Sequence, residues 1–219
     1  MFSNDASFFV RVSDVAPEVV QELRYATCDN FTGRPVPGYD APDALLLRET
    51  ADALRRVLED LRPKGLGLKL FDAYRPQCAT DALVEWSGDP EDTLMKSRYY
   101  PDVNKADMTA QGYLGRRSRH SRGSAVDVTL IDLATGEELD MGSPFDFFGD
   151  ISHPDSALVT PLQRGNRMRL RDAMTRRGFA PLSTEWWHFS LIDEPFPETW
   201  FTFTLAEGIR GICRESGPA

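Results

Sequence analysis

Ser118-Arg-His120-Ser-Arg-Gly123-Ser-Ala-Val-Asp127-Val-Thr-Leu-Ile131 joins a polar loop to an apolar segment. From residue 124 onward, valine and leucine alternate with smaller or polar residues, which is typical of a β-strand. Asp127 therefore occupies one defined face of an otherwise apolar strand. A carboxylate in such a place is costly to bury unless a cation or another partner accompanies it.

The segments on either side of this strand predict helices and strands that do not alternate regularly. Leucine and alanine at three- and four-residue steps predict an amphipathic helix that starts after Asp43 and ends at Pro63. We expect 137–141 to pair with the 124–131 strand as a hairpin across a turn at 134–136. The other expected elements are helices over 77–86 and 161–177, strands over 67–73 and 186–191, and a short helix followed by a loop over 91–117.

This order of elements favours an α+β fold in which a central, mainly antiparallel sheet is flanked by helices. The strands cluster after residue 124, and the expected hairpin makes them antiparallel. No linker-like stretch, charge block or internal repeat divides the chain, so we expect a single domain over residues 1–219. Residues 205–219 carry no clear pattern.

Charge and hydropathy exclude two classes of partner. The chain has 25 basic and 34 acidic residues, a net charge of −9, and no Lys/Arg run longer than a pair, whereas nucleic acid requires a basic surface. No stretch approaches the ~20 apolar residues that span a membrane.

Residues 1–10 lack the features of a signal peptide, and three widely spaced cysteines fit a reducing compartment, so we expect a cytoplasmic protein. No pattern fixes an oligomeric state.

The densest basic stretch, Arg116-Arg117-Ser-Arg119 with Arg122, borders the loop that contains His120. Such a stretch is typical of a solvated loop beside a site. It also suits the attraction of a substrate that carries a carboxylate.

A second segment, Glu185-Trp-Trp-His188, supplies the remaining parts of a possible metal site. Only three histidines occur in 219 residues, and two of them lie in these two segments. Two imidazoles and Asp127 match the three protein ligands of a catalytic zinc site, whose fourth position is open to water, and Glu185 is available as a base. Taken singly, His120 suits a loop histidine and His188 a core histidine, but the inward-facing Asp127 favours the metal.

Glu185 stands three residues before His188, and in a regular strand these two side chains would face opposite sides. If both reach one ion, we expect a bulge or turn at Glu185-Trp186. The two tryptophans indicate a dry environment, in which the pKa of a carboxylate rises toward the range of a base catalyst.

Two further polar residues follow apolar segments. Arg75, in Phe71-Asp-Ala-Tyr-Arg-Pro76, either pairs with Asp72 as a structural residue or aims its donors at a developing oxyanion. Asp146 follows a tight turn at residues 141–145, and by itself is typical of a turn residue rather than a ligand.

These segments together resemble one known family. Ser-x-His-x-x-Gly-x-Ala-x-Asp at 118–127, followed by Glu-x-x-His at 185–188, is similar to the zinc signature shared by D-Ala-D-Ala dipeptidases, related carboxypeptidases and hedgehog-like proteins. The resemblance to the D-Ala-D-Ala dipeptidase branch covers residues 20–204. Further matching segments are Tyr25-Ala-Thr, Asp29-Asn-Phe-Thr-Gly33, Gly38-Tyr39, Asp72-Ala-Tyr-Arg-Pro76, Tyr99-Tyr-Pro101, Gly142-Ser-Pro-Phe-Asp146 and Phe179.

The resemblance implies a hedgehog/DD-peptidase-like fold and a catalytic site with one zinc ion per chain. His120, Asp127 and His188 would ligate the zinc. Glu185 would be the general base for attack by a zinc-bound water, and Arg75 would stabilise the tetrahedral oxyanion. The implied reaction is hydrolysis of D-Ala-D-Ala to two D-alanines.

The resemblance also implies a constricted substrate pocket. Asp146 and Ser118 would receive the ammonium end of the dipeptide, and Tyr39 and Trp186 would help to wall the pocket. Two alternatives stay open: a DD- or LD-carboxypeptidase acting on peptidoglycan peptides, and a zinc-bearing binding module without catalysis. The missing export signal disfavours the first, and the presence of Glu185 and Arg75 disfavours the second.

Overall fold

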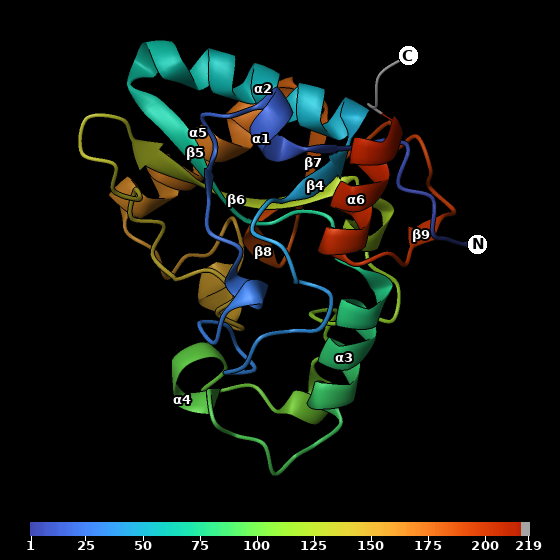
Figure 1. The fold of residues 1–219 in the computed structure, drawn as a ribbon. Helices are drawn as coiled ribbons and strands as arrows, with labels where there is room; N and C mark the ends of the chain where they lie inside the picture. The colour runs from blue at the N-terminus through green and yellow to red at the C-terminus, as the bar shows by residue number, and fades with distance from the viewer. Residues whose placement is uncertain (216–219) are drawn as a thin grey trace.

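The computed structural model describes residues 1–215; residues 216–219, the end of the expected domain, lie outside the described residues. A five-stranded sheet crosses the molecule (Figure 1), in the order β3 (Val20–Gln21), β5 (Leu66–Asp72), β6 (Ala125–Asp132), β8 (Glu185–Leu191) and β7 (Phe179–Leu182). Neighbouring strands are antiparallel except for the β3–β5 pair. The expected α+β fold with a mainly antiparallel central sheet is therefore confirmed.

Helices flank this sheet. α2 (Arg48–Leu61) and α5 (Pro161–Arg176) contact each other and the sheet strands, whereas α3 (Gln77–Ser87) and α4 (Lys96–Tyr99) lie at the opposite end of the molecule from α2 (Figure 1). The remaining elements are α1 (Val12–Val15), α6 (Leu205–Glu215), β1 (Phe2–Ser3), β2 (Phe9–Arg11), β4 (Leu45–Leu47), β9 (Trp200–Phe201), and 3₁₀ turns at Arg24–Ala26, Arg62–Lys64, Lys105–Asp107, His120–Arg122 and Asp150–Ser152.

The predicted amphipathic helix corresponds to α2, whose apolar positions Ala51, Leu54, Leu58 and Leu61 are all buried. Burial of each leucine contributes roughly 1.5–3 kcal/mol. The helix starts later than the sequence indicates, because residues 45–47 form β4 instead. Leu45, Leu46 and Leu47 are all fully buried, which three consecutive residues of a helix with one apolar face cannot achieve. β4 pairs with β2, and β1 pairs with β9 in parallel.

The expected hairpin strand over 137–141 is wrong. Only an isolated bridge between Ile131 and Glu138 forms beside β6. The chain then turns toward α5, because the Asp140 carbonyl accepts a hydrogen bond from Asn166 and its carboxylate accepts one from Gln163, each at 2.9 Å. Strand β7, which the sequence did not predict, occupies the edge of the sheet beside β8.

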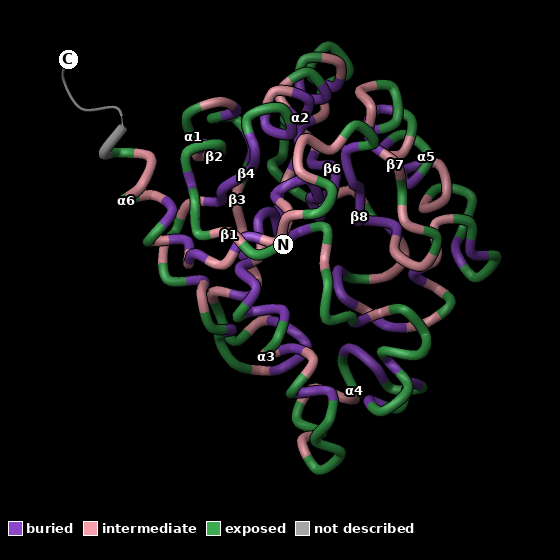
Figure 2. The backbone as a smooth tube through the Cα atoms, turned by 90° about the vertical axis from the view of Figure 1, so that its right-hand side faces the viewer, coloured by how far each residue is buried: buried purple, intermediate pink, exposed green. Residues whose placement is uncertain are grey.

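Buried residues follow β4, β6 and β8 through the centre of the molecule (Figure 2). The first seven residues of β6 are all buried, so Asp127 lies within the core and not at its surface. Of the helices in residues 1–215, none combines the length and the apolar character that a membrane span requires.

Candidate metal and active site

Three adjacent strands bring the candidate ligands together. In the sheet register, Asp127 of β6 lies opposite His188 of β8 on one side and opposite Asp72 of β5 on the other. The β5–β6 pairing shifts between Leu70 and Asp72, so a bulge at Phe71 sets the end of β5 against Asp127. Residues far apart in the sequence thus meet at one point of the sheet.

His120 reaches the same point from a 3₁₀ turn that leads into β6. This turn ends at Gly123, whose φ of +70° is a conformation that residues with a Cβ rarely adopt. A Cβ at Gly123 would also lie 2.5 Å from Cε1 of Phe9. The glycine therefore allows the tight turn between His120 and Asp127.

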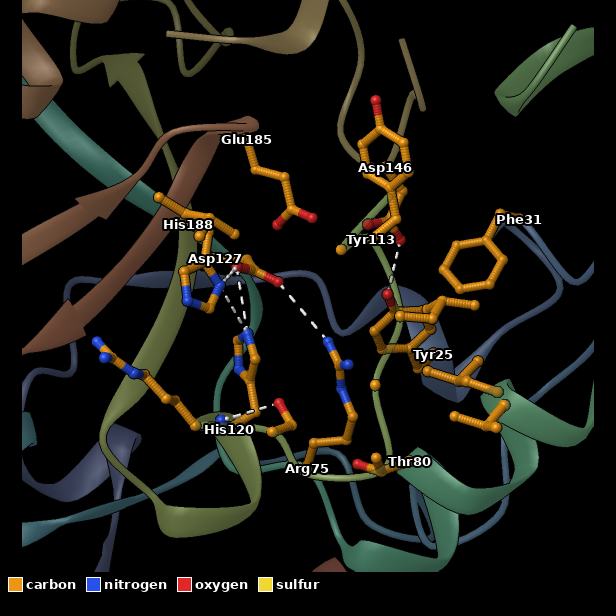
Figure 3. Close-up of a pocket in the computed structure, with 18 of the residues that line it drawn as sticks. Tyr25, Phe31, Arg75, Thr80, Tyr113, His120, Asp127, Asp146, Glu185 and His188 are labelled. Carbon is orange, nitrogen blue, oxygen red and sulfur yellow. Dashed lines mark hydrogen bonds and ion pairs between the residues drawn. The ribbon is translucent and has the colours of Figure 1, made fainter. Parts of the chain in front are cut away.

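The three candidate ligand atoms lie close together (Figure 3). His188 Nδ1 is 3.0 Å from Asp127 Oδ1, His120 Nε2 is 3.3 Å from the same oxygen, and the two ring nitrogens are 3.1 Å apart. In each histidine, the outer ring nitrogen is the one that faces away from this cluster, and it has a partner of its own. His120 Nδ1 is 2.7 Å from the carbonyl oxygen of Ala73, and His188 Nε2 is 3.0 Å from Ser190 Oγ. When both outer nitrogens donate to these oxygens, both inner nitrogens present lone pairs.

This arrangement fits a bound divalent metal. Two lone pairs and a carboxylate oxygen facing one another repel unless a cation lies between them. Burial alone would raise the pKa of Asp127, but when the histidine nitrogens that face it carry protons they hold that pKa well below its usual value, so the carboxylate is ionised. Two imidazoles and a carboxylate suit zinc, and hydrogen bonds donated by the outer nitrogens are those that orient metal-binding histidines.

Glu185 lies at the start of β8 and points toward the same space as Asp127 and His188 (Figure 3). The β7–β8 register shifts between Pro181 and Leu182, so that Pro181 pairs with Phe189 while Leu182 pairs with Glu185. This irregularity is the expected bulge, and it places Glu185 and His188 on the same cavity. Burial raises the pKa of Glu185 to about 7.

Arg75 follows β5 and is held by Asp72. Asp72 Oδ2 accepts hydrogen bonds from Arg75 Nε and Nη2 at 2.9 and 2.8 Å, and Arg75 Nη2 is 3.9 Å from Asp127 Oδ2. The guanidinium also lies over the ring of Tyr25, 5.0 Å from its centroid. The two roles that the sequence left open for Arg75 are thus compatible: it pairs with Asp72, and its charge lies beside the ligand cluster.

Asp146 is the one non-glycine residue with a left-handed backbone in the described chain, at a φ of 60°. Such strain persists only where the surroundings hold it in place, and it is found preferentially at functional sites. The Tyr25 hydroxyl donates a hydrogen bond to Asp146 Oδ2 at 2.8 Å. Burial raises the pKa of Asp146 well above its usual value.

A cavity of about 360 Å³ joins these groups. Its lining residues include His120, Asp127 and His188, which we call the ligand triad, and Ser118. Its other polar or charged lining residues include Arg75, Thr80, Arg117, Asp146 and Glu185.

Two residues expected to wall this cavity do not line it. The Tyr39 hydroxyl donates to Asp72 Oδ1 at 2.6 Å, so Tyr39 lies behind Asp72 and holds it. Trp186 lies on the opposite side of β8, where its indole N–H donates to Ser143 Oγ at 3.0 Å. Strand alternation accounts for this, because Trp186 lies one residue from Glu185.

Sequence reasoning missed two residues of the site. Ser190 lies two positions after His188, so the period of the strand places both on one face, and this signal was available. Tyr25 comes from a turn 121 residues away from Asp146. No spacing in the chain predicts that contact.

Three side chains that could hold a metal, beside a buried glutamate and a fixed guanidinium, are typical of a metallopeptidase. Residues 5–206 match the D-ala-D-ala dipeptidase family of peptidases, Peptidase_M15, and the chain belongs to that family. It is 43% identical over 198 residues to a D-alanyl-D-alanine dipeptidase of Streptomyces coelicolor, and 41% identical over 198 residues to one of Enterococcus faecalis. In both cases the alignment covers 90% of this chain and 98% of the relative.

Among solved structures, a vancomycin resistance D,D-pentapeptidase, VanY, in complex with Zn(II) is similar with a TM-score of 0.42. It is 17% identical in sequence, and the match covers 73% of this chain and 83% of that chain.

Proposed function

We propose that this protein is a zinc-dependent dipeptidase that hydrolyses D-Ala-D-Ala to two molecules of D-alanine, with one zinc ion per chain. The observation that carries the proposal is the convergence of His120, Asp127 and His188 in a cavity that also receives Glu185. Two curated relatives, of whose length the match covers 98%, are named D-alanyl-D-alanine dipeptidases.

His120, Asp127 and His188 would hold the metal through Nε2, a carboxylate oxygen and Nδ1. Zinc bound there supplies Lewis-acid activation of water and of the scissile carbonyl. The Ala73 carbonyl and Ser190 Oγ fix the two rings, so the ligand atoms keep their orientation through the reaction.

Glu185 acts as the general base in this proposal. A carboxylate whose pKa lies near 7 can accept a proton from the attacking water and return it to the leaving amine at neutral pH. Arg75 supplies positive charge to the oxyanion that develops on the carbonyl oxygen. Its two hydrogen bonds to Asp72 fix the guanidinium before the substrate arrives, so no reorganisation is needed at that moment.

Asp146 and Ser118 receive the substrate's ammonium group. Asp146 is buried in the cavity wall and carries a carboxylate whose one hydrogen-bonding side chain is the neutral hydroxyl of Tyr25. An ammonium group offers this carboxylate the cationic partner that the described protein does not place in hydrogen-bonding contact with it. Its position in a cavity of about 360 Å³ favours a substrate as small as a dipeptide.

The length of the substrate separates this proposal from a carboxypeptidase. We would measure D-alanine release by the zinc-loaded protein from D-Ala-D-Ala and from a pentapeptide that ends in D-Ala-D-Ala. The proposal expects release from the dipeptide and little from the pentapeptide. Comparable kcat/KM on the pentapeptide would identify a carboxypeptidase, and no release from either would identify a binding module.

A further inference from the structure

Arg117 lies in the loop before the metal-binding turn, is exposed to solvent, and is one of the residues that line the active-site cavity. This combination places Arg117 at the mouth of the cavity. The residue belongs to the basic stretch of 116–122, and none of the steps proposed above uses it.

Two aromatic rings hold the Arg117 guanidinium. Its central carbon is 4.4 Å from the ring centroid of Phe2 and 4.4 Å from that of Trp200. Phe2 of β1 and Trp200 of β9 are direct partners in the parallel β1–β9 register, so their side chains are cross-strand neighbours. An arginine stacked on aromatic rings uses its faces for the contact and keeps its N–H edge available.

Three other arginines near this loop have carboxylate partners. Arg75 pairs with Asp72, and Arg122 makes two hydrogen bonds to Glu194 at 2.6 and 2.7 Å. Arg119 is 3.7 Å from the same glutamate. Within residues 1–215, Arg117 makes no ion pair and its guanidinium donates no hydrogen bond to a protein atom. It is therefore a positioned cation whose N–H donors are free at the cavity mouth.

We infer that Arg117, held by Phe2 and Trp200, binds the C-terminal carboxylate of the dipeptide and gives the enzyme a preference for substrates with a free C-terminus. This inference rests on the proposed function. A dipeptide with free ends carries one ammonium and one carboxylate group. Asp146 serves the first, and Arg117 is the cavity-lining arginine that no carboxylate of the described residues neutralises.

The test compares two substrates on matched variants of the zinc-loaded protein. D-Ala-D-Ala and its C-terminal amide differ only in the charge that Arg117 is assigned to bind. Arg117→Gln should raise KM for the acid about tenfold, as expected for loss of one charge-assisted pair, with little change in kcat. The same variant should leave kcat/KM for the amide nearly unchanged, which also reports that the protein is folded.

Arg116→Gln is the matched control, because it makes the same charge change one residue away and Arg116 does not line the cavity. It should keep the wild-type ratio of kcat/KM between acid and amide. Phe2→Leu should raise KM for the acid about two- to fivefold through loss of a cation–π contact. Phe8→Leu, which removes another exposed aromatic ring at 46% exposure, should not.

The outcomes separate the two proposals. If the wild type hydrolyses D-Ala-D-Ala but Arg117→Gln lowers kcat/KM equally for acid and amide, or for neither, the assignment of Arg117 is wrong and the proposed function stands. If the wild type does not hydrolyse D-Ala-D-Ala, the proposed function fails and the assignment of Arg117 fails with it.

Discussion

Asp72 Oδ2 accepts two hydrogen bonds from Arg75, at 2.9 Å from Nε and 2.8 Å from Nη2, and both residues face the carboxylate of Asp127. Asp72 is itself held, because Tyr39 donates to its other oxygen. A fully buried carboxylate therefore fixes the guanidinium of Arg75 beside Asp127. The alignment of Arg75 is a property of the fold before any substrate binds.

Asp72→Asn should lower kcat by about tenfold or more while leaving KM and zinc content near wild type, because Arg75 loses its fixed position and not its charge. Steady-state kinetics and metal analysis on the purified variant measure this. Tyr39→Phe should give a smaller loss in the same direction, since it removes only the bond behind Asp72. An unchanged kcat in Asp72→Asn would show that Arg75 does not need this support.

Glu185→Gln should keep zinc and lose activity. The amide has nearly the same shape as the carboxylate but cannot accept the proton, and general-base catalysis contributes roughly a hundred- to ten-thousand-fold. Metal content and kcat measured on the same preparation separate proton transfer from metal binding. Turnover within a few-fold of wild type would rule out Glu185 as the base.

Ser190→Ala should weaken zinc binding by about ten- to a hundredfold, because His188 loses the partner of its outer ring nitrogen. Competition with a chelator of known affinity measures the change. Thr129→Val is a matched control, since the Thr129 hydroxyl is buried on β6 without a hydrogen-bond partner among the described residues. Equal zinc affinities in the two variants would contradict the role of Ser190.

Asp146→Asn should stabilise the protein at neutral pH and should raise KM. Burial raises the pKa of Asp146 above its value in the unfolded chain, so its favourable contribution to folding is complete below the unfolded pKa and is lost as the pH rises through the folded pKa. The difference in Tm between variant and wild type should therefore grow from about pH 4 toward neutral pH.

Thermal unfolding of both zinc-loaded proteins across that range is the measurement. Asparagine also tolerates the left-handed backbone at this position, but that effect does not depend on pH. A Tm difference that stays constant with pH would therefore contradict the raised pKa.

Local patterns were sufficient for the central elements, and together with the family resemblance they predicted the candidate ligands His120, Asp127 and His188. The alternating residues of β6 predicted which face of the strand Asp127 occupies. Glu185 and His188 are three residues apart, so they can reach one cavity only if the strand contains a bulge, and β8 contains one. The three-residue steps in α2 predicted its buried face. In each case the information lies within one turn or one strand of the chain.

Contacts between distant segments were not predictable in this way. The hairpin expected over 137–141 is limited to one bridge at Glu138, and beyond it Asp140 accepts hydrogen bonds from side chains of α5. Trp186 was expected at the cavity, but its neighbour Glu185 occupies that face of β8. The strained backbone of Asp146 depends on tertiary surroundings that no short stretch of sequence contains.

The central claim is tested most directly by the stereochemistry and metal dependence of hydrolysis. The zinc-loaded protein would be assayed with D-Ala-D-Ala, D-Ala-L-Ala and L-Ala-L-Ala, before and after treatment with a chelator and after zinc is restored. We predict hydrolysis of the D,D-dipeptide that the chelator abolishes and zinc restores, with little hydrolysis of the L,L-dipeptide. A preference for L-Ala-L-Ala, or activity that survives complete removal of the metal, would contradict the account.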